Sequence, residues 1–141
     1  MSAYVKFQPF SENLAEKVHN LGADTLKVAL SDTLPTNTFA TFSQITEIAA
    51  GFGYSAGGTA ASISSSAQTS GTYKLVLGDV TFTASGGSIG PYRYVILYND
   101  TPTSPADPLI SYWDYGTEIT TTDGNSFTTD FSAINGVLQL A

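Results

Sequence analysis

The feature that most constrains this fold is a short strand pattern with large side chains on both faces. It opens the aromatic stretch Pro91–Gly116, in which two strands flank a loop, Asn99–Pro108, rich in Pro, Asp, Ser and Thr. The alternating residues of the first strand are Tyr92, Tyr94, Ile96 and Tyr98 on one face and Arg93, Val95 and Leu97 on the other. Such a strand is stable only when both faces are covered. The pattern therefore predicts a strand at the centre of a sandwich or between packed subunits.

Most of the remaining chain also has strand patterns. Leu26–Leu30 alternates cleanly, and Thr59–Gln68 and Thr72–Ala84 read as paired strands joined at Ser70-Gly71. In the strand Thr72–Ala84, Tyr73, Leu75 and Leu77 share one face, but Val80 and Phe82 are offset by one residue. This change of face predicts a bulge or corner at Gly78-Asp79. Many short strands with frequent turns predict a mainly β fold, a β-sandwich or jelly-roll-like single domain.

Two dipeptides mark turns near the C-terminus. Asp123-Gly124 predicts a hairpin, and Asn135-Gly136 predicts a turn before a last strand, Val137–Leu140. Residues Phe39–Ala49 fit either a short helix or a strand. The glycine-rich run Gly51–Gly58 is interpreted as a mobile or subunit-contacting loop.

The N-terminus has a different pattern. Residues 1–10 read as an extended arm, and the spacing of apolar residues predicts one helix over about residues 11–21. Ser11 is the predicted N-cap and Gly22 the predicted end of the helix. Residues 11–141 are then one β-rich domain.

The composition excludes several classes of function. Charged residues make up only 12% of the 141, and the net charge is −7 with five cations, too few for a basic nucleic-acid surface. Cysteine is absent, which removes disulfides and thiol chemistry. No apolar run is long enough for a membrane span, and the N-terminus lacks the pattern of a secretory signal. We expect a protein used in the cytoplasm of the cell that makes it, without a nucleic-acid or membrane partner.

Candidate catalytic groups are few. His19 is the only histidine, and we interpret it as a residue on the helix surface near the C-terminal end. Four carboxylates near the aromatic stretch could serve glycoside cleavage or sugar binding, but loop aspartates are more often turn formers. These are Asp100, Asp107, Asp114 and Glu118. We expect no enzyme, no cofactor and no metal site, and we interpret Asp123-Gly124-Asn125 as a turn rather than a calcium loop.

Several segments in order carry a resemblance to a known group of proteins. They are Asp24–Leu30, Gly51–Gly58, Asp79–Phe82, Arg93–Asp100, Pro108–Gly116 and the closing strand after Asn135-Gly136. With these segments the chain resembles small β-rich virion proteins of tailed bacteriophages. The resemblance spans nearly the whole chain, while each segment alone is only moderately specific.

The resemblance implies a structural protein on the capsid exterior, a decoration or cement protein that binds the major capsid protein and stabilises the assembled head. It implies no catalytic residues. Because such sites usually lie near symmetry axes, we expect a homotrimer. The alternatives are a neck, tail or head-fibre component and a lectin-like module that binds a surface glycan.

On this hypothesis, the partner contacts come from the arm, the glycine-rich loop and the aromatic stretch. The candidate contact residues are Tyr4, Phe7, Phe10, Phe52, Tyr54, Asp100, Asp107 and Trp113.

Overall fold

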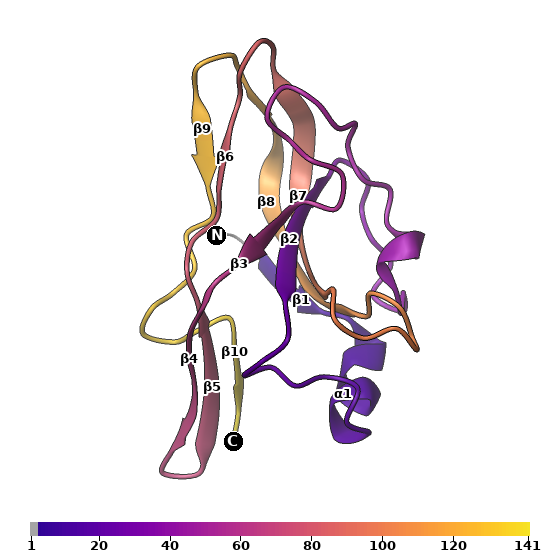
Figure 1. Cartoon of the computed structure of the whole chain (residues 1–141), viewed down its shortest axis with the longest axis vertical. Coiled ribbons are helices and arrows are strands. Elements are labelled where there is room, and N and C mark those ends of the chain that lie inside the picture. Colours follow the sequence, from indigo (N-terminus) through magenta and orange to yellow (C-terminus); the bar gives the residue numbers. More distant parts are fainter. Residues whose placement is uncertain (1–2) are drawn as a thin grey trace.

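The computed structural model of this chain describes residues 3–141. In that range it is mainly β, as the sequence predicts, with ten strands, one α-helix and one turn of 3-10 helix. The strands form three antiparallel sheets of five, three and two strands (Figure 1). No helix among the described residues has the length and apolar character needed to cross a membrane.

The largest sheet has five strands in the order β1-β8-β7-β2-β3. They are β1 (Ala3–Lys6), β8 (Leu109–Thr121), β7 (Ile89–Asn99), β2 (Leu26–Ser31) and β3 (Thr59–Ala61). The predicted central strand is β7, which pairs with β8 on one side and β2 on the other. The two aromatic strands of the sequence are therefore neighbours.

Both faces of β7 are covered, as its sequence requires. Val95 and Leu97 belong to the larger core, whereas Tyr94, Ile96 and Tyr98 belong to a second core on the other face. Tyr92, expected on the face of Tyr94, instead belongs to the larger core, because the pairing of β7 with β8 shifts register between Tyr92 and Tyr94. The second core is covered in part by the segment around η1 (Phe42–Gln44), whose Phe42 ring stacks on Tyr98 with the ring centroids 4.2 Å apart. The segment that was ambiguous in sequence is therefore mostly irregular chain that covers one face of the sheet.

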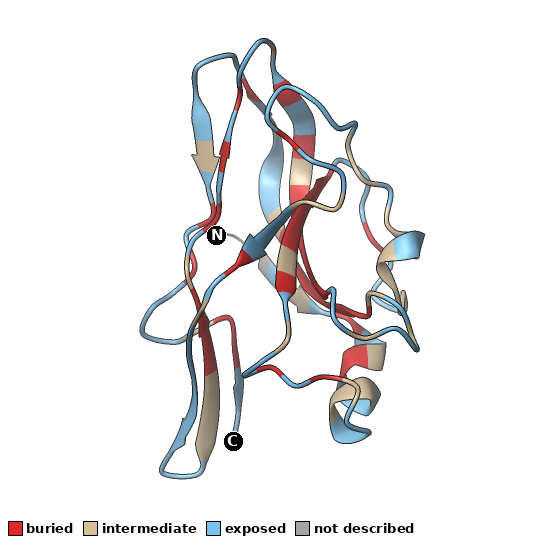
Figure 2. Cartoon of the chain, viewed as in Figure 1, coloured by how far each residue is buried: buried red, intermediate tan, exposed pale blue. Residues whose placement is uncertain are grey.

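The larger core lies between the five-stranded sheet and the two smaller ones. The three-stranded sheet, in the order β10-β5-β4, contains β10 (Leu138–Leu140), β5 (Thr72–Leu77) and β4 (Ile63–Thr69). The two-stranded sheet pairs β6 (Thr81–Thr83) with β9 (Ser126–Thr128). Figure 2 shows the buried residues concentrated on β2, β7 and β5, while β4 is exposed.

The predicted corner at Gly78-Asp79 is confirmed. Strand β5 ends at Leu77 and the chain enters a different sheet at Thr81. This change of sheet lets Leu75 and Leu77 share the larger core with Phe82. In a single regular strand, the odd-numbered Leu75 and Leu77 would point to one face and the even-numbered Phe82 to the other.

The N-terminal helix differs from its prediction. Helix α1 spans Gln8–Ala15 rather than 11–21, with Phe7 as its N-cap and Pro9 in its first turn. Proline is favoured there because the first helical N–H groups have no partner inside the helix. The helix ends early because Lys17 adopts a left-handed conformation with φ of 70°. The sequence pattern over residues 17–21 reflects burial of Leu21 rather than helix.

The Asp123-Gly124 hairpin was also predicted wrongly. The turn is present, but β8 is already paired with β7 and β1, and β9 pairs with β6 instead of with β8. By contrast, Ser70-Gly71 joins β4 to β5 in a two-residue hairpin, and the Asn135-Gly136 turn leads into β10 as expected.

Candidate functional site

Four of the eight candidate contact residues lie inside the molecule. Phe7, Phe10 and Tyr54 are at most 2% exposed, and Trp113 is 7% exposed. Trp113 lies beneath Tyr4, with the two ring centroids 5.5 Å apart. In this conformation these four side chains stabilise the cores and offer little surface to a partner.

The expected N-terminal arm is tied to its own chain. Strand β1 pairs with β8 in the register Ala3 to Asp114 and Lys6 to Ser111, and Phe7 follows directly into the second core. Residues 8–10 are helical rather than extended. The edge of β8 is therefore paired with β1 of the same chain, rather than with a strand of a partner.

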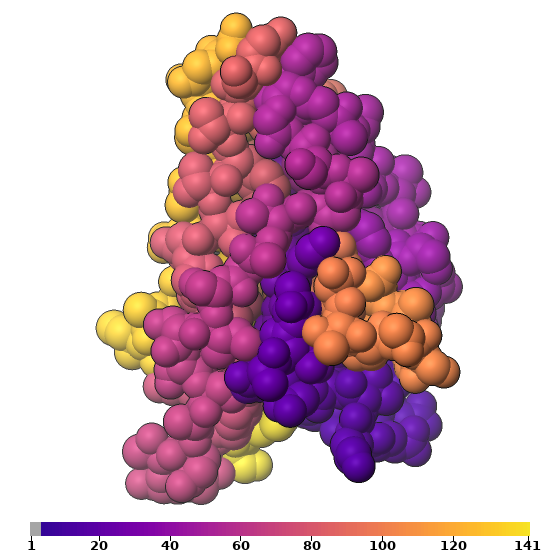
Figure 3. All heavy atoms as spheres, in the orientation of Figure 1, coloured from indigo at the N-terminus to yellow at the C-terminus, as the bar shows by residue number. Residues whose placement is uncertain are grey.

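The other four candidates are accessible, in three segments of the chain. Tyr4 is 41% exposed on β1 and Phe52 is 55% exposed in the glycine-rich loop. Asp100 is exposed and Asp107 half-buried in the loop between β7 and β8. This loop projects from the surface in the space-filling view (Figure 3).

The glycine-rich loop is fastened to the sheet by Tyr54. The Tyr54 hydroxyl accepts a hydrogen bond from the buried Leu30 N–H at 3.0 Å and donates one to Glu47 Oε2 at 2.5 Å. Burial, with the nearby Glu47 carboxylate adding to it, raises the pKa of Tyr54. The hydroxyl therefore stays protonated and keeps both bonds.

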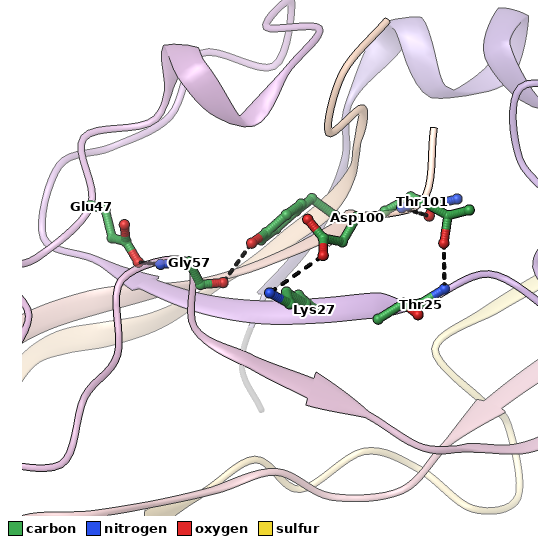
Figure 4. Close-up of polar contacts among 8 residues, drawn as sticks. Thr25, Lys27, Glu47, Gly57, Asp100 and Thr101 are labelled. Carbon is green, nitrogen blue, oxygen red and sulfur yellow. Dashed lines mark hydrogen bonds and ion pairs between the residues drawn. The ribbon is translucent and has the colours of Figure 1, made fainter. Parts of the chain in front are cut away.

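A second set of contacts fastens the end of the same loop. The Gly57 N–H donates to Glu47 Oε2 at 2.7 Å, and its carbonyl accepts from the Tyr98 hydroxyl at 2.5 Å (Figure 4). Gly58 has φ of 79°, and a Cβ there would lie 1.9 Å from the Val28 carbonyl oxygen. The loop Gly51–Gly58 thus packs directly on the β2 backbone. Its hydrogen bonds and close packing hold it in one conformation, rather than leaving it mobile.

Phe52 projects from this fixed loop. Its φ is 57°, and its ring lies against Gly87, where an added Cβ would approach it to 2.5 Å. One face of the ring therefore rests on backbone while more than half of the side chain remains in solvent.

Two carboxylates meet beside the loop end. Burial, then a hydrogen bond with Asp100 and its negative charge, raises the pKa of Asp107, while Lys27 opposes the shift. The Lys27 Nζ lies 3.4 Å from Asp100 Oδ2, and Figure 4 shows this pair above β2. Hydrogen-bonded carboxylates are closer than the roughly 5 Å that a retaining glycosidase needs between its two acids.

Asp114, a further carboxylate considered for sugar chemistry, has an ionic partner. Its two oxygens accept hydrogen bonds from Arg93 at 2.8 and 3.2 Å, and this lowers the pKa of Asp114. In the Asp123-Gly124-Asn125 turn, Asp123 Oδ1 accepts a hydrogen bond from Gly86 N–H. Within residues 3–141, no group of three or more His, Asp or Glu side chains is arranged to hold a metal ion.

His19 is buried rather than on a helix surface, which corrects its interpretation. Asn99 Oδ1 accepts from Thr101 N–H, so the Asn99 amide donates to Asp24 Oδ2 at 2.7 Å and to His19 Nδ1 at 3.0 Å. His19 Nδ1 is then an acceptor, and the neutral ring carries its proton on Nε2. Burial, opposed by Asp24, lowers the pKa of His19 to about 4.

A surface pocket of about 620 Å³ lies beside this cluster. It is lined by His19, Asp24 and Leu21 from the segment after α1, and by Tyr73 and Leu140 from the three-stranded sheet. No single motif marks this pocket, because its walls come from distant parts of the chain. His19 Nε2, buried and without a hydrogen-bond partner among the described residues, does not reach solvent.

Sequence reasoning also missed the long exposed edge at β4. This strand closes one side of the three-stranded sheet and reads ISSSAQT, with no charged residue and no proline. Its sequence shows a segment rich in serine and threonine hydroxyls, but only the pairing order reveals that it is an edge.

Comparison with known proteins adds no relative. No protein-family model, curated protein or solved structure matches the chain.

Proposed function

We propose that this chain is a structural virion protein of a tailed bacteriophage, a decoration protein that binds the major capsid protein on the outside of the assembled head. The resemblance of the sequence segments to small phage virion proteins motivates the proposal. The charge-poor, hydroxyl-rich composition supports it, because few ions must lose their water when such a surface is covered.

The observation that carries the proposal is the exposed Phe52 on a fixed loop. An aromatic side chain held in one conformation loses little entropy on binding, and such anchors provide much of the energy of protein interfaces. Tyr54 and Tyr98 fix the loop from below, while Phe52 faces solvent. A docking role therefore explains why a fastened loop retains a large apolar group at its surface.

The test is co-sedimentation of the purified protein with phage heads assembled without it, followed by imaging of the pellet. We expect saturable binding at regular capsid positions, weakened at least about tenfold by Phe52→Ala. Ile134→Ala is the matched control, because Ile134 is a still more exposed apolar residue, at 79%, in another loop. Equal effects of the two substitutions would remove the assigned role of Phe52.

Failure to bind intact heads would overturn the decoration proposal and favour the neck, tail or head-fibre alternative. The homotrimer expected from the resemblance is one alternative, and sedimentation of the free protein distinguishes it from a dimer or a monomer.

A second candidate is binding of a surface glycan. The pocket of about 620 Å³ favours it, since Asp24, Asn20 and the hydroxyls of Ser66 and Tyr73 supply polar groups beside apolar walls. Trp113, one of the candidate contact residues, is buried and does not line this pocket. Glycan-array binding that is lost in Asp24→Asn and retained in Asp123→Asn would support this function.

A further inference from the structure

The edge strand β4 differs from every other sheet edge in the described part of the chain. It has seven residues, whereas β1 has four and β3, β6, β9 and β10 have three each. Long edges are normally protected by charged residues, proline or short length, because unpaired main-chain groups bind other strands. Strand β4 has none of these protections, and its one register irregularity lies between Ile63 and Ser65, at the end away from the hairpin turn.

The hairpin geometry identifies the main-chain groups that are free. Ser70 and Gly71 form the two-residue turn, with positive φ values of 54° and 87°, and Thr69 pairs with Thr72. In a hairpin of this kind the residues flanking the turn form the hydrogen-bonded pair, and hydrogen-bonded positions then alternate along the strand. The N–H and C=O groups of Ser66 and Gln68 therefore point away from β5.

The charge distribution favours a neutral partner strand. The chain has no carboxylate between Glu47 and Asp79, and Lys74 is the only charged residue in that interval. With a net charge of −7, two copies repel each other over most of their surfaces. The interval that contains β4 is the longest stretch of the chain without an acidic residue, so two copies that meet along β4 repel each other less there than elsewhere.

The side chains also permit close approach. Ser64, Ser65, Ala67 and Thr69 are exposed, and they line a groove of about 530 Å³ on the sheet. None of these side chains is large, so no bulky group covers the edge. Hydroxyl groups facing each other across antiparallel strands form favourable pairs.

We propose that two copies of this chain pair their β4 strands antiparallel across a two-fold axis, joining two three-stranded sheets into one sheet of six strands. The occupant of the edge is a second copy because β4 is neutral and therefore self-complementary in charge, which suits an isologous contact. The Ser66 and Gln68 main-chain groups provide its hydrogen bonds. The proposal does not depend on a capsid partner.

The test uses the whole protein in sedimentation equilibrium over a wide concentration range. We expect the average mass to rise from the 14.8 kDa of the monomer to twice that value. Ala67→Lys should raise the dimer dissociation constant at least about tenfold, because the two-fold axis brings the new charges of the two copies close together. The control is Gln139→Lys, which we expect to leave that constant unchanged.

This control is closely matched. Ala67 on β4 and Gln139 on β10 are the two direct cross-strand neighbours of Lys74, so each variant adds one lysine beside the same cation in the same sheet. Only position 67 is on the β4 edge. Equal effects of the two variants would show that net charge, rather than the β4 edge, controls association.

A measurement on the unmodified protein tests the β4 pairing without any substitution that could disturb folding. Amide hydrogen exchange of Ser66 and Gln68 should slow as the protein concentration rises, while the exposed amide of Ser70 in the turn stays fast. A monomer at all concentrations, a trimer, or a dimer in which these two amides exchange at the same rate as in the monomer would overturn the pairing. None of these outcomes depends on whether the protein binds phage heads.

Discussion

The Tyr98 hydroxyl, near the end of the central strand, donates a hydrogen bond of 2.5 Å to the carbonyl oxygen of Gly57. This contact joins the strand that dominates the sequence pattern to the loop that seemed freest in sequence. Tyr98 is also covered by the stacked ring of Phe42. The aromatic strand therefore organises both its own sheet and the loop that displays Phe52.

The first prediction concerns the buried hydroxyl of Tyr54. Tyr54→Phe removes the acceptor of the Leu30 N–H, which is left buried and unpaired. We expect the free energy of unfolding to fall by about 1–3 kcal/mol. Tyr73→Phe is the control, because the Tyr73 hydroxyl bonds only the exposed Ser66 hydroxyl, and its loss should cost less than about 1 kcal/mol. Urea unfolding followed by Trp113 fluorescence measures both, and similar losses would contradict the assigned role of Tyr54.

The second prediction separates backbone strain from lack of space. Gly58 and Gly71 both have positive φ, 79° and 87°, but a Cβ at Gly58 meets the Val28 carbonyl whereas one at Gly71 meets nothing within 4 Å. Gly71→Ala should cost only the left-handed conformation, about 1–2 kcal/mol. Gly58→Ala should cost a further 1–3 kcal/mol, roughly, because the loop must move off β2. Thermal unfolding of the two variants gives the comparison, and equal losses would show that the loop yields easily.

The sequence predicts the strands of this protein better than their partners. Periodicity locates β2, β5 and β7, because a buried strand needs apolar residues at fixed spacing. The Asp123-Gly124 turn shows the limit. The two residues of a turn report only the local chain direction. The partner of β9 depends instead on which strand has an unpaired edge, and that strand is β6.

The exposure of the candidate contact residues was also hard to predict, because it depends on how distant segments pack together. Aromatic residues such as Phe7 and Trp113 suit an interface and a core equally well, and only the fold decides between them. His19 was misplaced because its main partner, Asn99, lies 80 residues away. Phe52 was correctly expected in a loop, but the fixed conformation of that loop depends on Glu47 and Tyr98.

The third prediction follows from the lowered pKa of His19. The unfolded chain takes up a proton near the ordinary value of 6.5, whereas burial in the folded protein delays protonation to about 4. Between these pH values the unfolded state binds more protons, so lowering the pH favours unfolding. After allowance for solvent screening, we expect a loss of about 1–2 kcal/mol across this window in the unmodified protein.

The measurement for His19 compares the unmodified protein with His19→Gln at pH 7.5 and 4.5. Groups other than His19 titrate in both proteins and cancel in the comparison. Only the unmodified protein loses the contribution of His19 in acid, so its advantage in the free energy of unfolding over His19→Gln should be smaller at pH 4.5 than at pH 7.5. Titration of the His19 Hε1 resonance by NMR gives the pKa directly. The Phe10 ring lies against the His19 ring, with the two centroids 5.0 Å apart. A midpoint near 6.5 would show that this contact and the Asn99 hydrogen bond do not exclude the charged form of His19.

The fourth prediction uses the paired carboxylates Asp100 and Asp107. The raised pKa of Asp107 means that the folded state holds this proton more tightly than the unfolded chain. The resulting stabilisation is fully present below about 3.8 and is lost as the pH rises through the folded pKa. Asp107→Asn removes the repelling charge, and asparagine tolerates the left-handed φ of 49° at this position. We expect the variant to be more stable at pH 7 by less than about 1 kcal/mol, with no gain at acid pH.

Asp114→Asn is the control for Asp107→Asn, because its effect should have the opposite sign. The Arg93 guanidinium lowers the pKa of Asp114, so this carboxylate contributes stability above the ordinary value of 3.8 and loses it as the pH falls through the lowered one. The asparagine variant should therefore be less stable than the unmodified protein at pH 7, with the difference shrinking in acid. Urea unfolding of both variants at pH 3 and pH 7 measures the two trends. If both variants changed stability in the same direction at pH 7, a change in overall charge would explain them better than their local partners.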